Sequence, residues 1–118
     1  HEITDDYFNF LPSKSVDLVY EMTVFQHILE NITLRYMQET SRILRNDGFM
    51  VAQFLMNDSN PIKNPSKNKE GIMYYSHDEI VDMAKKSGLT IVKFANYDWS
   101  DGKGSYWRLY LFKNSQAH

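Results

Sequence analysis

The fold is decided by residues 15–57, which read SVDLVYEMTVFQHILENITLRYMQETSRILRNDGFMVAQFLMN. They contain an apolar run at residues 16–22, an amphipathic pattern at residues 31–45, an Asn-Asp-Gly turn at residues 46–48 and a second apolar run at residues 49–56. Two β-rich runs joined by a crossover of this length are most simply parallel neighbours, with the helix packed on one face of the sheet. The stretch therefore predicts an α/β fold.

One face of the expected helix at residues 31–45 is apolar, and Asn31 is a favourable N-cap residue. Three- and four-residue spacing predicts that this face packs in the core. Its members are Ile32, Tyr36, Met37, Thr40, Ile43 and Leu44. The strand that follows, at residues 49–56, is apolar almost throughout, so it is expected to be buried on both faces.

A second helix is predicted to begin after Ser76. Ser76 and Glu79 match a capping box, and Tyr75 and Ile80 have the spacing of a hydrophobic staple. Gly88 suits the residue at which a helix ends in a left-handed conformation.

Two β-rich segments, residues 90–99 and 105–113, lie on either side of turn residues and predict an antiparallel hairpin. Lys93, Arg108 and Lys113 alternate with apolar neighbours in these segments. This alternation predicts that each strand has a wetter face near an edge of the sheet.

A long surface loop is predicted at residues 57–74, where Asn, Ser, Lys and Pro dominate without any period. Loops of this length inside a compact domain are commonly functional or disordered. His77, just beyond the loop, is expected to face solvent.

Composition limits the classes of protein to consider. The chain has 118 residues, of which 42% are hydrophobic and 24% charged, so residues 1–118 are expected to form one globular domain. The net charge of −2 gives no basic field for nucleic acid, and the absence of cysteine excludes disulfides and cysteine-ligated metals. No histidine spacing suggests a metal site. No apolar run approaches the roughly 20 residues that span a bilayer, and no signal-peptide pattern is present, so a cytoplasmic protein is expected.

Several motifs resemble the second half of a class I S-adenosylmethionine-dependent methyltransferase domain. They are SVDLVY at residues 15–20, QHI at residues 26–28 and ETSRILRNDGF at residues 39–49. In that family a strand of the type "FDLV" is followed by a loop and helix that often bear a histidine, and then by "E..R.LkpGG". Val16 replaces the usual Phe, and Asn-Asp-Gly replaces Lys/Pro-Gly-Gly while keeping turn chemistry. The resemblance implies a partial Rossmann-like sheet flanked by helices, with strand order first, second, last, third and the last strand antiparallel.

The same resemblance implies residues that bind S-adenosylmethionine. Asp5 or Asp6 matches the acidic loop whose aspartate contacts the adenine, although a solvated acidic loop is the alternative reading of these two residues. Glu21, Met22 and Thr23 follow the first strand at its carboxyl end, where ligands of open α/β sheets bind.

The remaining site candidates concern the methyl acceptor. Gln26 and Asp58 are expected to bind the acceptor, and His27 or Glu21 is expected to act as a general base toward its nucleophile. The alternative for His27 is a histidine at a helix start that is satisfied by backbone groups.

No glycine-rich turn follows a strand in this sequence, whose five glycines all suit turns, a helix end or a loop. The resemblance therefore covers only about the latter half of the family's domain. We expect either a fragment of a longer enzyme or a remnant that pairs with another chain, and weak or no cofactor binding and no activity for the isolated chain. The alternative function is a non-catalytic α/β interaction module that binds a partner through its sheet edge or its aromatic hairpin.

The strand at residues 16–22 is expected to lie at an open edge of the sheet. An unpaired apolar edge is a template for pairing with another chain, so a homodimer through this edge is predicted. The alternative is that residues 2–10 fold back and shield the edge.

Overall fold

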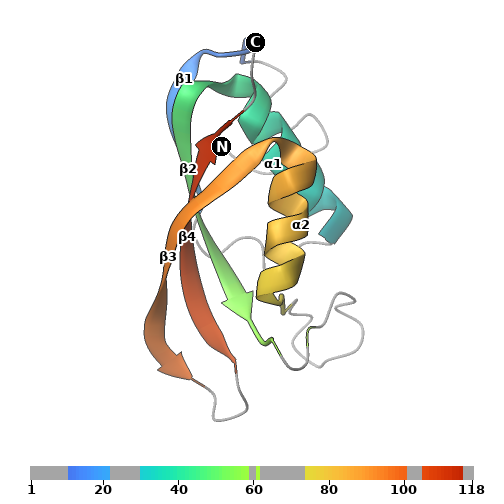
Figure 1. Cartoon of the computed structure of the whole chain (residues 1–118), viewed down its shortest axis with the longest axis vertical. Helices are drawn as coiled ribbons and strands as arrows, with labels where there is room; N and C mark the ends of the chain where they lie inside the picture. Colours follow the sequence, from blue (N-terminus) through green and yellow to red (C-terminus); the bar gives the residue numbers. More distant parts are fainter. Residues whose placement is uncertain (1–10, 22–29, 59–60, 62–73, 101–104, 116–118) are drawn as a thin grey trace.

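The computed structural model describes residues 11–21, 30–58, 61, 74–100 and 105–115 (Figure 1). Its elements are β1 (Val16–Glu21), α1 (Glu30–Ile43), β2 (Leu44–Met56), α2 (His77–Ser87), β3 (Leu89–Ser100) and β4 (Tyr106–Asn114). The strands form one sheet, and both helices lie on the same side of it (Figure 1). The fold is α/β, as predicted.

The strand order is β1-β2-β4-β3. β1 and β2 are parallel, whereas β4 is antiparallel to both β2 and β3. The predicted hairpin is therefore present, and its second strand is inserted beside β2. This confirms the order expected from the family resemblance.

The Asn-Asp-Gly turn lies within β2 and not before it. Leu44 pairs with Val16, whereas the next paired residue, Phe49, lies opposite Leu18. The chain passes through the turn between these pairs, and Asp47 adopts a left-handed φ of 65°. A Cβ on Gly48 would lie 2.9 Å from the carbonyl oxygen of Arg45, so only glycine fits there without a backbone shift. The helix consequently ends at Ile43, two residues earlier than predicted.

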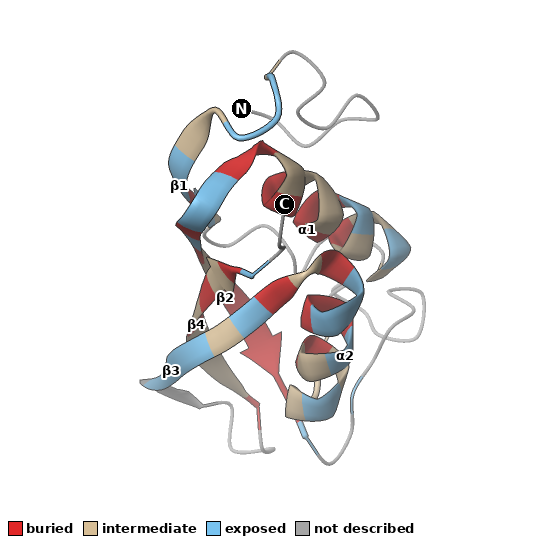
Figure 2. Cartoon of the chain, turned by 45° about the horizontal axis from the view of Figure 1, so that its top comes forward, coloured by how far each residue is buried: buried red, intermediate tan, exposed pale blue. Residues whose placement is uncertain are grey.

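The helix-covered face of the sheet holds the core. The largest fully buried side chains include Tyr36, Tyr75, Tyr110, Phe54 and Phe112. Figure 2 shows that the buried residues of α1 and α2 face the sheet.

Ile32 was expected in that core but is only half-buried. Thr33 and Ser41 are buried instead. Together with Tyr36, Met37 and Thr40 they follow three- and four-residue spacing, and Ile32 lies one position outside this stripe. The stripe on α1 is therefore more polar than hydrophobicity alone predicts.

The opposite face of the sheet is bare near β1. Leu18, Tyr20 and Phe49 are 54%, 69% and 38% exposed. The expectation that β2 is buried on both faces is therefore wrong at Phe49, because no described helix covers this side. It is confirmed farther along, where Gln53 and Leu55 are both buried.

The start and end of α2 agree with the sequence pattern. The Ser76 hydroxyl accepts from the Glu79 amide, and the Glu79 carboxylate accepts from the Ser76 amide at 2.8 Å. Gly88 ends the helix with a left-handed φ of 73°. The predicted capping box and glycine cap are confirmed.

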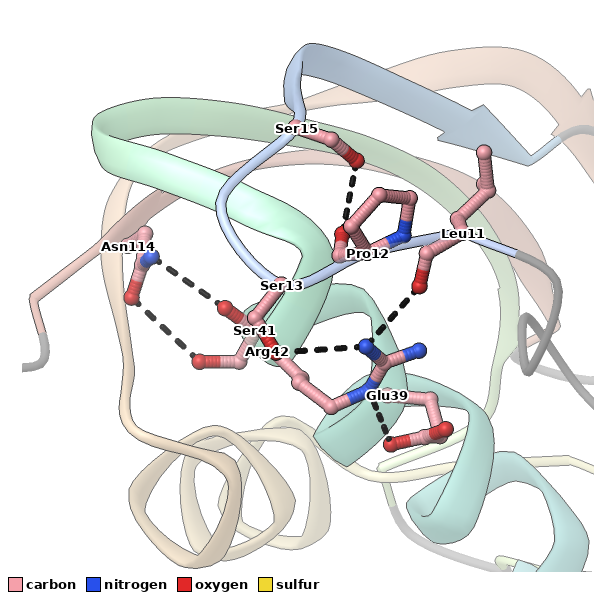
Figure 3. A network of polar contacts seen from close by, with 8 residues as sticks. All are labelled: Leu11, Pro12, Ser13, Ser15, Glu39, Ser41, Arg42 and Asn114. Atoms are coloured by element: carbon pink, nitrogen blue, oxygen red, sulfur yellow. Dashed lines mark hydrogen bonds and ion pairs between the residues drawn. The ribbon is translucent and has the colours of Figure 1, made fainter.

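A network of polar contacts lies at the end of the sheet where α1 ends and β1 begins (Figure 3). The guanidinium of Arg42 donates to the Leu11 carbonyl at 3.0 Å and to Glu39 at 3.0 Å. The side-chain amide of Asn114 donates to the carbonyls of Ser41, Leu44 and Arg45 at 3.2, 3.0 and 3.2 Å. The Asn114 amide satisfies carbonyls at and just after the end of α1, where backbone acceptors lack partners within the helix, and Arg42 ties α1 to the segment before β1.

Candidate functional site

The carboxyl ends of β1 and β2 lie at the same edge of the sheet because the two strands are parallel. Glu21, the last residue of β1, pairs with Ala52, and β2 continues to Met56. Ligands of open α/β sheets bind beyond such ends. Among the described residues, this edge carries the polar side chains of Glu21, Asn57 and Asp58.

Glu21 is a half-buried carboxylate held by a helix residue. Its Oε1 atom accepts a hydrogen bond from the hydroxyl of Tyr36 on α1. Burial raises the pKa of Glu21, and the bond from Tyr36 offsets part of the rise. Burial and the bond to Glu21 both raise the pKa of Tyr36, so the tyrosine stays protonated as the donor. Glu21 therefore retains a proton to higher pH than an exposed glutamate does.

The chain segments that follow β2 and precede α2 are joined by backbone hydrogen bonds. The Asn57 amide donates to the Tyr75 carbonyl at 2.8 Å, and the Tyr75 amide donates to the Leu55 carbonyl at 2.9 Å. The Asn57 side chain donates to the Ser105 hydroxyl at 3.1 Å, and the Tyr75 hydroxyl donates to Thr33 at 3.3 Å. The two described ends of the segment predicted as a loop at residues 57–74 are thus fixed at this edge.

Asp58 is held by two elements at once. Its Oδ1 atom accepts from the His77 amide at the start of α2 at 2.8 Å, and its Oδ2 atom accepts from the Tyr106 hydroxyl. Burial acts to raise the pKa of Asp58, but the bonds from Tyr106 and His77 and the charge of Arg108 outweigh it and lower the pKa. Burial and the bond to Asp58 raise the pKa of Tyr106 to about 12. Asp58 is therefore an ionised carboxylate with a fixed orientation.

Arg108 lies at the centre of a cluster that we call the Arg108 cluster, made of Asp58, His77, Tyr106, Arg108 and Tyr110. Its Nη1 atom donates to the Tyr110 hydroxyl at 3.1 Å, and its Nη2 atom donates to the Tyr106 hydroxyl at 3.2 Å. The expectation that Arg108 lies on a wet face is wrong, because it is only 8% exposed. The reason is that β4 is an interior strand, and this face of it lies under α2.

The guanidinium is also held from β3. Its Nε atom donates to the Asn96 side chain at 2.7 Å, and its carbon atom lies 4.0 Å from the centre of the Phe94 ring. A cation over a ring face is attracted by the ring's quadrupole. Arg108 thus joins β3, β4 and the start of α2.

His77 is half-buried and not in solvent, so the expectation for it is wrong. Its Nδ1 atom lies 2.8 Å from the Tyr110 hydroxyl and 3.3 Å from Nη1 of Arg108. A guanidinium can only donate, so these contacts favour an unprotonated Nδ1. The sequence signal was the alternation Tyr106, Arg108, Tyr110, which places an arginine between two tyrosines on one face of a strand.

Most sequence-predicted site residues lie outside the described part of the chain. They are Asp5, Asp6, Met22, Thr23, Gln26 and His27. Glu21 and Asp58 lie at the carboxyl ends of two adjacent parallel strands, each with its own tyrosine donor, but Glu21 is level with Ala52 whereas Asp58 lies beyond Met56. In the described ranges, no three acidic or histidine side chains form a group that could hold a metal ion.

No family model and no curated protein sequence matches this chain. Solved structures do match. A methyltransferase of Methanosarcina mazei that depends on S-adenosylmethionine has a TM-score of 0.69 and 10% identity, and the match covers 91% of this chain and 63% of that one. The 1,6-didemethyltoxoflavin-N1-methyltransferase of Burkholderia thailandensis, solved with 1,6-didemethyltoxoflavin and S-adenosylhomocysteine, has a TM-score of 0.68 and 13% identity over 88% of this chain and 46% of that one.

This chain has part of the class I methyltransferase fold. It spans 46% to 63% of the length of the two methyltransferases just described. The cyclase SpnF is similar as well, with a TM-score of 0.67 and 7% identity over 90% of this chain and 52% of that one. Identities this low show the fold alone, so the activity has to be argued from the site. In the described part of the chain, no helix has the length and apolar character needed to cross a membrane.

Proposed function

We propose that this chain provides one part of an S-adenosylmethionine-dependent methyltransferase site. The observation that carries the proposal is the pair of oriented carboxylates, Glu21 and Asp58, at the carboxyl edge of two parallel strands in this fold. Bound S-adenosylmethionine supplies an electrophilic methyl group on a positively charged sulfur. A half-buried carboxylate such as Glu21 suits a cationic group, because it is negatively charged when ionised and accepts hydrogen bonds.

The proposed roles of the individual residues follow from the family resemblance and from their positions in the sequence. Glu21, Met22 and Thr23 contact the cofactor, and Asp5 or Asp6 contacts its adenine. Asp58 orients the methyl acceptor, a small molecule or a protein, together with Gln26. Transfer needs the acceptor nucleophile aligned with the methyl carbon at close distance, and fixed side chains favour that alignment.

Two residues compete for the role of base. Glu21 has a raised pKa, which brings a carboxylate closer to the pH at which a general base is efficient. His27 is the other candidate. Either residue accepts the proton that the acceptor's nucleophile loses as the new bond to carbon forms.

The rest of such a domain would cover the bare face formed by Leu18, Tyr20 and Phe49. Because no glycine-rich turn follows a strand in this sequence, the chain by itself is proposed to bind the cofactor weakly and to be inactive. β1 is the outermost strand of the described sheet and Leu18 and Tyr20 are exposed on its face, which supports the further proposal of a homodimer in the isolated chain. Sedimentation at micromolar concentration tests the dimer, and a monomer at all concentrations would contradict it.

The proposed location of the protein is the cytoplasm.

A titration of the isotope-labelled chain with S-adenosylmethionine, followed by amide chemical shifts, tests the cofactor proposal. We expect shifts that grow up to millimolar ligand and concentrate at Glu21 and its neighbours in β1. Absence of shifts at this edge would contradict the proposal and favour the non-catalytic interaction module. Micromolar affinity would instead contradict only the statement that the chain binds weakly.

A further inference from the structure

β3 forms the second edge of the sheet, and no described strand pairs with its outer side. Its pairing with β4 shifts register between Ile91 and Lys93 and then runs without interruption through Asn96. Val92 and Phe94 are 49% and 46% exposed along this edge. A free strand edge with exposed apolar side chains is a template for an added strand.

A groove lies between this edge and α2. It has a volume of about 500 Å³. Val81 of α2 and Ile91, Val92 and Phe94 of β3 contribute its apolar walls. The groove is therefore suited to the apolar side chain of an extended segment that lies along β3.

A second hollow, of about 340 Å³, borders the same part of β3 and extends over its neighbour β4. Val51, Ala95, Leu109 and Leu111 contribute its apolar lining. Residues 93 and 94 border both hollows. Side chains of a strand alternate between the two faces of a sheet, so consecutive apolar residues of an added strand would reach one hollow and then the other.

The positive charges beside β3 favour an acidic partner. Lys85 and Lys93 line the groove, Lys93 also lines the second hollow, and no described carboxylate lines either one. Two copies of this chain paired along β3 would bring like charges together, which is unfavourable. An acidic segment instead places its carboxylates beside the two lysines.

We propose that an extended, acidic segment of a partner protein adds as a strand along residues 93–96 of β3. Its backbone pairs with the free edge, its apolar side chains enter the two hollows, and its carboxylates lie beside Lys85 and Lys93. Main-chain hydrogen bonds give affinity in this mode of recognition, and pockets for alternate side chains give specificity. This proposal does not depend on the methyltransferase proposal, because its binding surface is the outer strand β3 and not the ends of β1 and β2, although His77 and Phe94 border both the groove and the Arg108 cluster.

The probe is the synthetic peptide Glu-Glu-Val-Phe-Val-Glu-Glu, compared with a matched peptide that has lysine in place of each glutamate. We expect the acidic peptide to cause saturable amide shifts and slower hydrogen exchange at residues 92–96, and the basic peptide to cause neither. The double variant Lys85→Glu/Lys93→Glu should bind the acidic peptide about tenfold more weakly, because attraction at two exposed positions becomes repulsion.

Lys86→Glu is the matched control. Lys86 lies beside Lys85 on α2, but it pairs with Asp82 at 2.9 Å and does not line the groove. We expect its affinity for the peptide to stay within about twofold of the wild type. Three results would overturn the proposal. The double variant could bind the acidic peptide as tightly as the wild type does, with its amide spectrum intact. The peptide could cause shifts only at Leu18 and Tyr20, or it could fail to bind at millimolar concentration. Concentration-dependent shifts at residues 92–96 without peptide would also overturn it, since a second copy would then occupy the edge.

Discussion

A polar network lies at each end of the sheet, and the partners of the two networks differ. At the end of the sheet where β1 and β2 begin, Asn114 donates to three main-chain carbonyls, and Arg42 donates to a fourth. At the carboxyl edge, Arg108 donates to the side chains of Tyr106, Tyr110 and Asn96. Main-chain carbonyls cannot move away when a donor is lost, whereas side chains can reorient toward water. The first network should therefore matter for stability and the second for the shape of the site.

The largest effect is expected for Asn114→Ala. The substitution removes one amide that serves the Ser41, Leu44 and Arg45 carbonyls, and Asn114 itself is 2% exposed. Leaving buried acceptors without a donor should lower the free energy of unfolding by about 3 kcal/mol. Urea denaturation measures this change in the free energy of unfolding. A loss below about 1 kcal/mol would mean that water replaces the amide and that the two networks are alike.

A smaller loss is expected for Arg108→Met, which keeps the aliphatic part of the side chain. The hydroxyls of Tyr106 and Tyr110 and the amide of Asn96 can find other partners, so the free energy of unfolding should fall by about 1 to 2 kcal/mol. Amide shifts should change at Asp58 and His77, because Arg108 contacts the residues that orient them. A loss as large as that of Asn114→Ala would contradict the proposed difference between the two ends.

Most of the fold could be predicted because it depends on local patterns. The capping box at Ser76 and Glu79, the glycine at residue 88 and the apolar runs all specify short-range structure. The predicted helix end after residue 45 was wrong because the turn there is set by a tertiary contact. Gly48 approaches the Asp17 carbonyl of β1, and a single sequence does not reveal which backbone lies beside a glycine.

The site could be predicted only in part. The places of Glu21 and Asp58 at or just after strand ends could be predicted, because apolar runs in the sequence show where strands end. His77 and Arg108 were misplaced because their burial depends on how α2, β3 and β4 meet. Segments distant in sequence supply those partners, and the period of hydrophobic residues carries no information about them.

The third prediction concerns acid stability at the carboxyl edge. The pKa of Asp58 is lower in the folded chain than in the unfolded chain. The ionised Asp58 therefore stabilises the fold fully at pH values above its pKa in the unfolded chain, and this stabilisation is lost as the pH falls through its pKa in the folded chain. Tyr106→Phe removes the hydroxyl that donates to Asp58. The pKa of Asp58 should then rise toward its ordinary value, and the loss of stability below about pH 4 should become shallower. A carboxyl NMR titration measures the pKa directly, and an unchanged value would show that the other contacts suffice.

The smallest effect is expected at Glu21, and it has the opposite sign. Burial raises the pKa of Glu21, so the protonated form is favoured in the folded chain, and this contribution is lost as the pH rises through the raised value. Glu21→Gln keeps an oxygen that can accept from Tyr36 but carries no charge. At pH 7 the variant should be slightly more stable, by less than about 1 kcal/mol because Glu21 is partly solvated. The variant should also respond more weakly than the wild type to S-adenosylmethionine at β1. Urea denaturation at pH 4 and pH 7 measures the first effect, and equal stability changes at both values would show that burial of the charge does not matter here. A glutamine side chain cannot accept a proton as a carboxylate does. Glu21→Gln therefore also shows whether the Glu21 carboxylate is needed for function or for the fold.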